Sequence, residues 1–243
     1  MKTEYARQLD VYSTDQSVEK CKIFFEKYWL TKDELKVSWN KLKELIFNST
    51  AESLPDLMFR NGFLVYPTVA RSIFNSEKDF NLLQECWEVT GDKSFVIIQN
   101  DKSRVKSFNL DENKYEQEPL IRFKFPSDIS WQDLKSEPMS IDMHTGDFYV
   151  FGDSGSWGRY VSTEYVEPIE QNHSNAYTDP LKLYFPLNIT GFKKEYSNLF
   201  CSALFNLWKE ELSLYPEQQI TREKVFNRWL PIAYKNLIPH KWR

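Results

Sequence analysis

The stretch FYVFGDSGSWGRYVS, residues 148–162, decides the fold. Two runs rich in aromatic and branched residues flank a short polar, glycine-containing centre, which is typical of two strands joined by a tight turn. Asp153 and Ser154 can hydrogen-bond nearby backbone, and Gly155 can adopt a positive φ at little cost. The pattern therefore predicts a β-hairpin whose turn is Asp153–Ser156.

The same turn contains Gly-Asp-Ser-Gly, which resembles the nucleophile segment of trypsin-like serine proteases. A serine of that kind needs an imidazole to take its proton and a carboxylate to orient the imidazole. The chain has three histidines, and His144 would lie roughly 20 Å or more along the strand from Ser154. Position 156 is also serine where that motif and the esterase elbow have glycine. We therefore predict no catalytic residue here.

The aromatic side chains of this hairpin suggest a different role. Strict alternation places Tyr149 and Phe151 on one face and Phe148 and Val150 on the other, so both faces are apolar. One face can form the core, and the other must be covered by helices, by the chain's loops or by a partner; the C-terminal helices are the first expectation. Because Trp, Tyr and Arg dominate binding energies at interfaces, we expect a protein-binding surface here. Its predicted residues are Phe151, Asp153, Trp157, Arg159 and Tyr160.

A metal site is the competing interpretation of this region. Asp142, His144, Asp147 and Asp153 carry oxygen and nitrogen ligands suited to a divalent ion. A metal-dependent hydrolase would need these residues to converge in one pocket, and an enzyme whose site is dispersed along the sequence would leave no motif. Turn chemistry explains the same residues without an ion. We therefore predict no metal and no cofactor, and keep the enzyme as the alternative.

Outside the hairpin, strands and helices do not follow one another in regular alternation. Residues 13–30 and 31–46 have helical periodicity, and Thr31 with Glu34 forms a capping-box pattern. Further strands are predicted at 94–100 and 119–125 and in the stretch 62–69, where Pro67 is expected to end the strand. A helix is predicted at 76–91 and a long helix from 192 to 212.

This order predicts an α+β fold, with a largely antiparallel sheet in the middle of the chain packed by N-terminal and C-terminal helices. An α/β fold is the second choice. We expect a single domain over residues 1–243, with the alternative that residues 1–50 form a helical hairpin beside a sheet-plus-helices core at 51–243.

Composition limits the class of protein. The 35 acidic and 31 basic residues are well mixed and give a net charge of −4, which provides no field for binding nucleic acid. The three cysteines are odd in number and far apart, so they indicate neither a disulfide framework nor a zinc site. No run approaches the roughly 20 apolar residues of a membrane span, and the first residues lack the apolar core of a signal peptide. We expect a cytoplasmic protein that does not bind membranes.

The leading functional hypothesis is a non-enzymatic, intracellular protein-binding module that acts through the aromatic hairpin. A bacterial immunity-type or regulatory protein, which neutralises or positions a partner, is the narrower form of this hypothesis. The expected partner is another protein, and the sequence leaves the oligomeric state open.

Overall fold

The structure, a computed structural model, describes the greater part of the chain. The described residues are 4–5, 18–52, 58–69, 73–74, 76–101, 106–109, 114–117, 120–135, 147–168, 182–196, 199–200, 203, 206, 210 and 213. His144, His173 and His240 lie outside them, as do Asp142 and Cys201.

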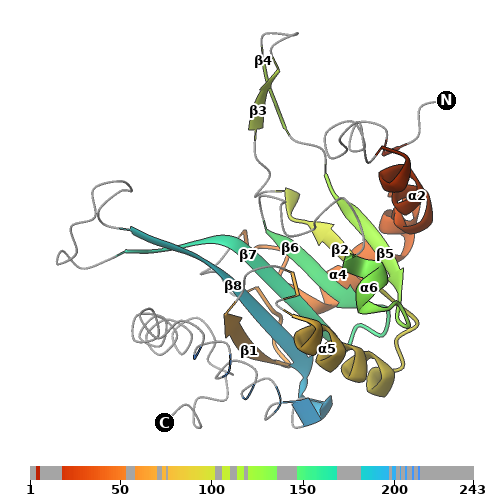
Figure 1. The fold of residues 1–243 in the computed structure, drawn as a ribbon. Coiled ribbons are helices and arrows are strands. Elements are labelled where there is room, and N and C mark those ends of the chain that lie inside the picture. Colours follow the sequence, from red (N-terminus) through yellow and green to blue (C-terminus); the bar gives the residue numbers. More distant parts are fainter. Residues whose placement is uncertain are drawn as a thin grey trace.

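Helices flank a central group of strands (Figure 1). The elements are α2 (Val18–Tyr28), α3 (Lys32–Glu34), η1 (Leu35–Trp39), α4 (Asn40–Ile46), β1 (Phe63–Val69), α5 (Glu77–Thr90), β2 (Ser94–Gln99), β3 (Lys106–Asn109), β4 (Lys114–Gln117), β5 (Arg122–Pro126), α6 (Trp131–Lys135), β6 (Phe148–Gly152), β7 (Trp157–Pro168) and β8 (Lys182–Lys193). η1 is one turn of π-helix that joins α3 to α4 in a continuous helical segment.

Six strands form one sheet in the order β1-β8-β7-β6-β2-β5, and every neighbouring pair is antiparallel. β3 and β4 pair separately. The predicted α+β fold is therefore confirmed. The predicted hairpin is confirmed as well: β6 and β7 flank the turn Asp153–Ser156, and Gly155 has a φ of 63°.

One face of the sheet is covered by α2, α5 and α6 (Figure 1). Trp87 of α5 lies at the centre of this layer. Its ring stacks at 4.3 Å on Phe95 of β2 and at 5.6 Å on Trp157 of β7. Because these rings come from three separate elements, their stacking joins α5 to the middle of the sheet.

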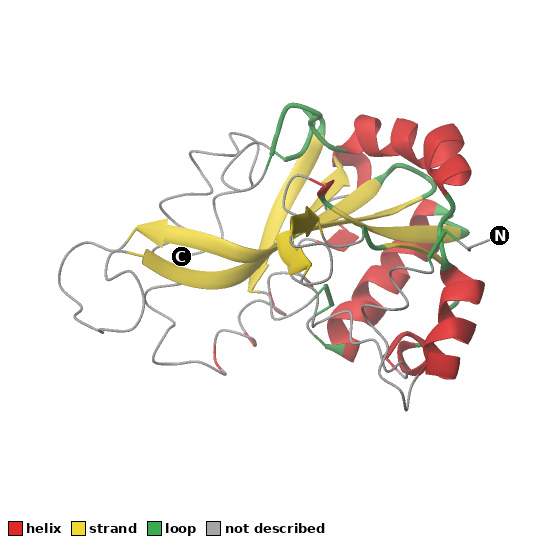
Figure 2. Ribbon diagram, turned by 90° about the horizontal axis from the view of Figure 1, so that it is seen from above, coloured by secondary structure: helices red, strands yellow, loops and turns green. Residues whose placement is uncertain are grey.

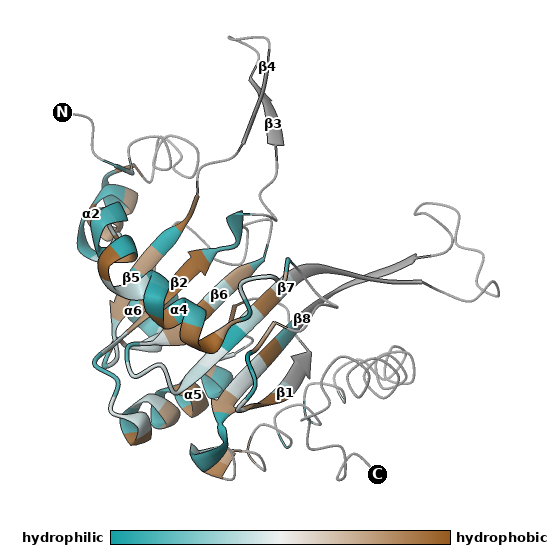
Figure 3. Ribbon diagram, turned by 180° about the vertical axis from the view of Figure 1, so that it is seen from behind, coloured by the Kyte–Doolittle hydropathy of each residue, from teal (hydrophilic) through white to brown (hydrophobic). Residues whose placement is uncertain are grey.

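The opposite face is covered by η1 and α4 (Figure 3). Trp39 and Phe47 contact the ring of Phe151 at 5.7 and 5.8 Å between centroids. C-terminal helices were expected on this face. Among the described residues the N-terminal segment covers it, and most of the C-terminal residues lie outside the described part of the chain. Figure 2 shows helices on both sides of the sheet.

The two N-terminal helical segments, α2 and η1 with α4, lie on opposite faces of the sheet. The chain passes from one face to the other at the edge strand β5. There Trp29 forms an isolated bridge with Phe123, and the Leu30 amide donates to the Arg122 carbonyl at 3.2 Å. This connection also occupies part of an edge that would otherwise be open.

Helix ends follow the sequence signals. The Thr31 side chain accepts from the Glu34 amide while Glu34 reaches back to the Thr31 amide, so the capping box is complete. Ser76 caps α5 in the same way by accepting from the Asp79 amide, and Gly91 ends this helix with a φ of 76°.

Two strands differ from the prediction. β1 continues through Pro67, where a stop was expected, because an edge strand can leave the position of the missing amide unpaired. β8 was not predicted at all, and it runs to Lys193, so the helix expected from residue 192 begins at Lys194.

Candidate functional site

The tip of the β6–β7 hairpin is fixed to the start of β2 by Asp153. Its carboxylate accepts from the Lys93 amide at 3.0 Å and from the Ser94 amide at 3.1 Å. It also accepts from the Ser94 hydroxyl at 3.0 Å. Asp153 is only partly exposed, and these bonds use its oxygens to hold the turn. The prediction expected bonds to nearby backbone, and the actual partners lie about sixty residues away.

The Ser154 side chain is hydrogen-bonded to the carboxylate of Asp92. Its hydroxyl donates to Asp92 at 3.0 Å and accepts from the Ser156 amide at 3.2 Å, while its own amide donates to Asp92 at 2.6 Å. The residue lies in a turn between two strands, which is not the strand-to-helix setting of an esterase elbow.

Asp92 is the acceptor for several donors that converge beneath this turn. Besides Ser154, the Trp157 indole donates to it at 2.9 Å, and the Thr90 hydroxyl is a further donor. Burial raises the pKa of this carboxyl, and the hydrogen bonds it accepts act in the opposite direction. The site is tightly filled, since a Cβ at Gly152 would lie 2.1 Å from an Asp92 oxygen.

Arg159 forms a buried ion pair with Asp79 of α5. Its two terminal nitrogens donate to the two carboxylate oxygens at 2.7 Å each, and neither side chain has any exposed surface. Further bonds run to Thr190 Oγ1 at 2.9 Å and to the Ile73 carbonyl at 3.0 Å. The guanidinium therefore has partners on α5, on β8 and on the segment before α5.

Tyr160 lies on the face of the sheet that η1 and α4 cover, and its hydroxyl takes part in a third cluster of polar groups. Its hydroxyl donates to the Asp147 carboxylate and accepts from Asn100 Nδ2 at 3.2 Å. Asn100 also donates to the Glu52 carbonyl at 2.7 Å. Burial, with the nearby Asp147 charge, raises the pKa of Tyr160 well above its usual value.

These contacts correct the predicted binding surface. Phe151, Trp157, Arg159 and Tyr160 have no solvent-accessible surface, and only Asp153 reaches solvent. The prediction failed because both faces of the hairpin are covered within the chain, by α5 on one side and by η1 and α4 on the other. In this conformation a partner cannot touch those four side chains.

The metal interpretation gains no support from the described residues. Asp147 and Asp153 stand at opposite ends of β6, six residues or about 20 Å apart along the strand. No group of three or more metal-binding side chains occurs in the part of the chain that the structure describes. Asp142 and His144 lie outside the described residues.

A two-stranded ribbon extends β7 and β8 beyond their neighbours (Figures 1 and 2). We define this ribbon as residues 163–168 and 182–186. Registered pairing with β6 ends at Val161 and pairing with β1 ends at Leu187, so among the described residues each ribbon strand pairs only with the other. A register shift lies between Ser162 and Tyr165, opposite Pro186, which suits a residue that has no amide to donate.

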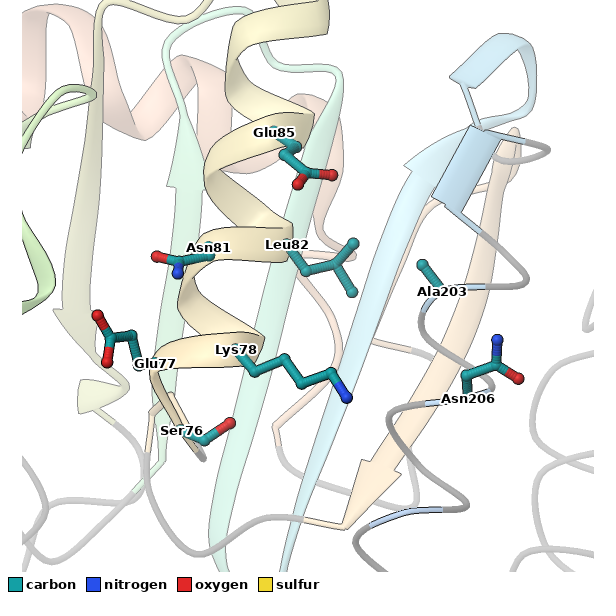
Figure 4. A pocket seen from close by; sticks show the side chains of 8 residues that line it. All are labelled: Ser76, Glu77, Lys78, Asn81, Leu82, Glu85, Ala203 and Asn206. Carbon is teal, nitrogen blue, oxygen red and sulfur yellow. The ribbon is translucent and has the colours of Figure 1, made fainter.

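A groove of about 770 Å³ lies beside α5 (Figure 4). Lys78 extends from α5 toward the segment that carries Ala203 and Asn206, and its ammonium pairs with Glu210. Six of the eight described lining residues carry a polar or charged group, and their aliphatic parts also line the groove. Its lining residues are Ser76, Glu77, Lys78, Asn81, Leu82, Glu85, Ala203 and Asn206.

Comparison of the chain with protein-family models, with curated proteins and with solved structures gives no match. In the part that the structure describes, no helix combines the length and the apolar character needed to cross a bilayer. Function therefore has to be argued from the geometry of this chain alone.

Proposed function

We propose that this protein is a non-enzymatic protein-binding module whose partner docks along the β7–β8 ribbon. The observation that carries the proposal is the ribbon itself, because its two outer edges have no registered strand among the described residues. Unpaired strand edges are templates for a strand from another chain, and many proteins use them for recognition. The expected partner is therefore a protein that adds an extended segment to one edge.

The residues at the ribbon positions suit such a contact. In register, Tyr165 pairs with Phe185 and Val166 pairs with Tyr184. Aromatic residues are enriched at interface centres, and a two-stranded ribbon alone is only marginally stable in water. An added strand would give these residues further neighbours and would complete backbone hydrogen bonds along one edge.

The narrower hypothesis of an immunity-type or regulatory protein is kept, with the β7–β8 ribbon as its binding surface in place of the hairpin. A bacterial immunity-type or regulatory protein, acting in the cytoplasm, would use the ribbon to neutralise or position its partner. The buried hairpin at residues 148–162 then serves as the rigid base from which the ribbon extends, because Asp153, Arg159 and Tyr160 fix it to three other parts of the chain.

The test compares two double variants of the full chain. Tyr165→Ser with Phe185→Ser changes one registered pair of the ribbon. Val37→Ser with Leu45→Ser is the matched control, since these residues are 68% and 62% exposed on the helical segment that covers the opposite face. Tagged chains are used to recover partners from the native lysate, and the affinity of each purified partner is then measured by titration calorimetry.

We expect the ribbon variant to bind its purified partner at least about tenfold more weakly, which corresponds to about 1.4 kcal/mol, while the control binds like the wild type. The melting temperature should stay close to that of the wild type, because the changed pair lies beyond the parts of β7 and β8 that pair with β6 and β1. Equal affinity of the ribbon variant and the wild type would rule out the ribbon as the binding surface.

A further inference from the structure

Arg122, at the start of the edge strand β5, is buried although it is charged. Its Nε donates to the Leu30 carbonyl at 2.6 Å, and its guanidinium lies 4.9 Å from the centre of the Trp29 ring. Its Nη2 donates to the carboxylate of Glu4 at 2.7 Å. The side chain of Arg122 is 5% exposed and that of Glu4 is 38% exposed.

Glu4 and Tyr5 both contact the region around Arg122 and Trp29. The Glu4 carboxylate also accepts from the Lys32 amide at 3.0 Å. The Tyr5 ring lies 5.5 Å from Phe25 and 5.9 Å from Trp29 between centroids. A carboxylate and an adjacent aromatic ring are thus held together by a cation, a backbone amide and two rings.

We propose that Arg122, Trp29 and Phe25 form a docking site for an acidic-aromatic segment, and that the chain's own Glu4–Tyr5 occupies this site exchangeably. The inference is independent of the ribbon, since it concerns the edge strand β5, whereas the ribbon extends the inner strands β7 and β8. It assigns residues 4–5 the role of a ligand that belongs to the same chain.

The burial on the two sides of the ion pair explains why the occupant can exchange while the site stays selective. The Glu4 side chain is partly in water, so it can leave and be hydrated without opening the core. Arg122 is buried, and a buried cation that loses its carboxylate is left uncompensated. Any replacement must therefore bring a carboxylate to Arg122 and a ring to Phe25 and Trp29.

The experiment uses the full chain with Glu4→Gln and Tyr5→Ala, which empties the site. The probe is a fluorescent peptide with the sequence of residues 1–10, MKTEYARQLD, titrated against this variant and against the wild type and followed by anisotropy. We expect the variant to bind the peptide at least about tenfold more tightly than the wild type, in which Glu4–Tyr5 already fills the site.

Two further titrations identify the contacts. A peptide in which the glutamate is replaced by glutamine should bind the variant at least about tenfold more weakly. Adding Arg122→Gln to the variant should remove the preference for glutamate over glutamine. The proposal fails if the peptide binds the wild type and the variant equally, or if the glutamine peptide binds as well as the original. The peptide comparison needs no change at Arg122, so it tests the proposal even if Arg122→Gln prevents folding.

Discussion

At the scale of single residues, Tyr149 and Tyr160 show what burial does to a phenol. Their rings lie 5.1 Å apart, and both side chains are almost wholly buried beside Asp147. Burial, together with the Asp147 charge, raises the pKa of Tyr149 to about 12 from an ordinary value of 10.0. Because ionisation would place a second negative charge in the same buried region, both phenols resist losing their protons.

This shift makes stability depend on pH in the alkaline range. A folded-state pKa above the unfolded value contributes stability that is fully present below pH 10 and is lost as the pH rises to about 12. Two pKa units correspond to about 3 kcal/mol. The free energy of unfolding of the wild type should therefore fall by about 2 kcal/mol more than that of Tyr149→Phe between pH 10 and 12, because half of the folded molecules still keep the proton at pH 12.

Urea unfolding followed by tryptophan fluorescence at half-unit intervals from pH 8 to 12 measures this difference. The gap between wild type and variant should stay constant from pH 8 to 9.5, which serves as the internal control. Parallel curves up to pH 12 would show that Tyr149 is not protected from ionisation by the fold.

Residues of the predicted site could be located from sequence, but their role could not. Trp157, Arg159 and Tyr160 each combine a large apolar body with a polar end, and both interfaces and polar cores use such side chains. What decides between the two is an acceptor elsewhere in the chain, here Asp92, Asp79 or Asp147. For Asp92 and Asp79 the separation is 65 and 80 residues, and no local pattern reports a pairing at that distance.

At the scale of elements, the Asp79–Arg159 pair is the main polar link between α5 and β7. Both charges are removed from water, and their attraction has to offset that desolvation. Removing the carboxylate alone leaves the arginine charge without its bidentate partner inside the protein. The pair should therefore be strongly coupled, whatever its net contribution to stability.

A double-mutant cycle tests this coupling. We expect Asp79→Leu to lower the free energy of unfolding by about 3–5 kcal/mol, and Asp79→Leu with Arg159→Met to lose at least about 2 kcal/mol less than that. Lys78→Met, which breaks the neighbouring exposed pair with Glu210, should cost less than about 1 kcal/mol. Denaturant unfolding of the wild type, Asp79→Leu, Arg159→Met, their double variant and Lys78→Met measures these values. Losses of the two single variants that simply add in the double variant would contradict the coupling.

Strand prediction succeeded where hydrophobic runs are plain and failed at β8. Ser94–Gln99 is apolar almost throughout and is buried on both faces, which the sequence pattern indicates directly. In β8, Leu183, Phe185, Leu187 and Ile189 alternate with other residues in the period of two expected of a strand. Pro186 interrupts that pattern, and its compatibility depends on the register shift in β7, which is a tertiary feature.

At the scale of the whole molecule, the N-terminal segment holds both layers together. α2 packs on the face that also carries α5, and η1 with α4 packs on the opposite face. The connection around β5 includes Trp29 and Leu30, which bond to that edge strand. Since Trp39, Ile46 and Phe47 supply much of the second layer, the sheet would lose its cover on that side without them.

This arrangement predicts that α4 and the central strands unfold together. Native-state hydrogen exchange should give amides of α4 and β2 the same free energy of opening to within about 1 kcal/mol, because neither can open without exposing the core that they share. Amides of the ribbon, such as those of Tyr165 and Val166, should open at clearly lower free energy, and they provide the comparison within one experiment. If α4 exchanged several kcal/mol more easily than β2, residues 1–50 would form a separately unfolding unit, and their cover of the second face would be an attachment to a sheet that is stable without it.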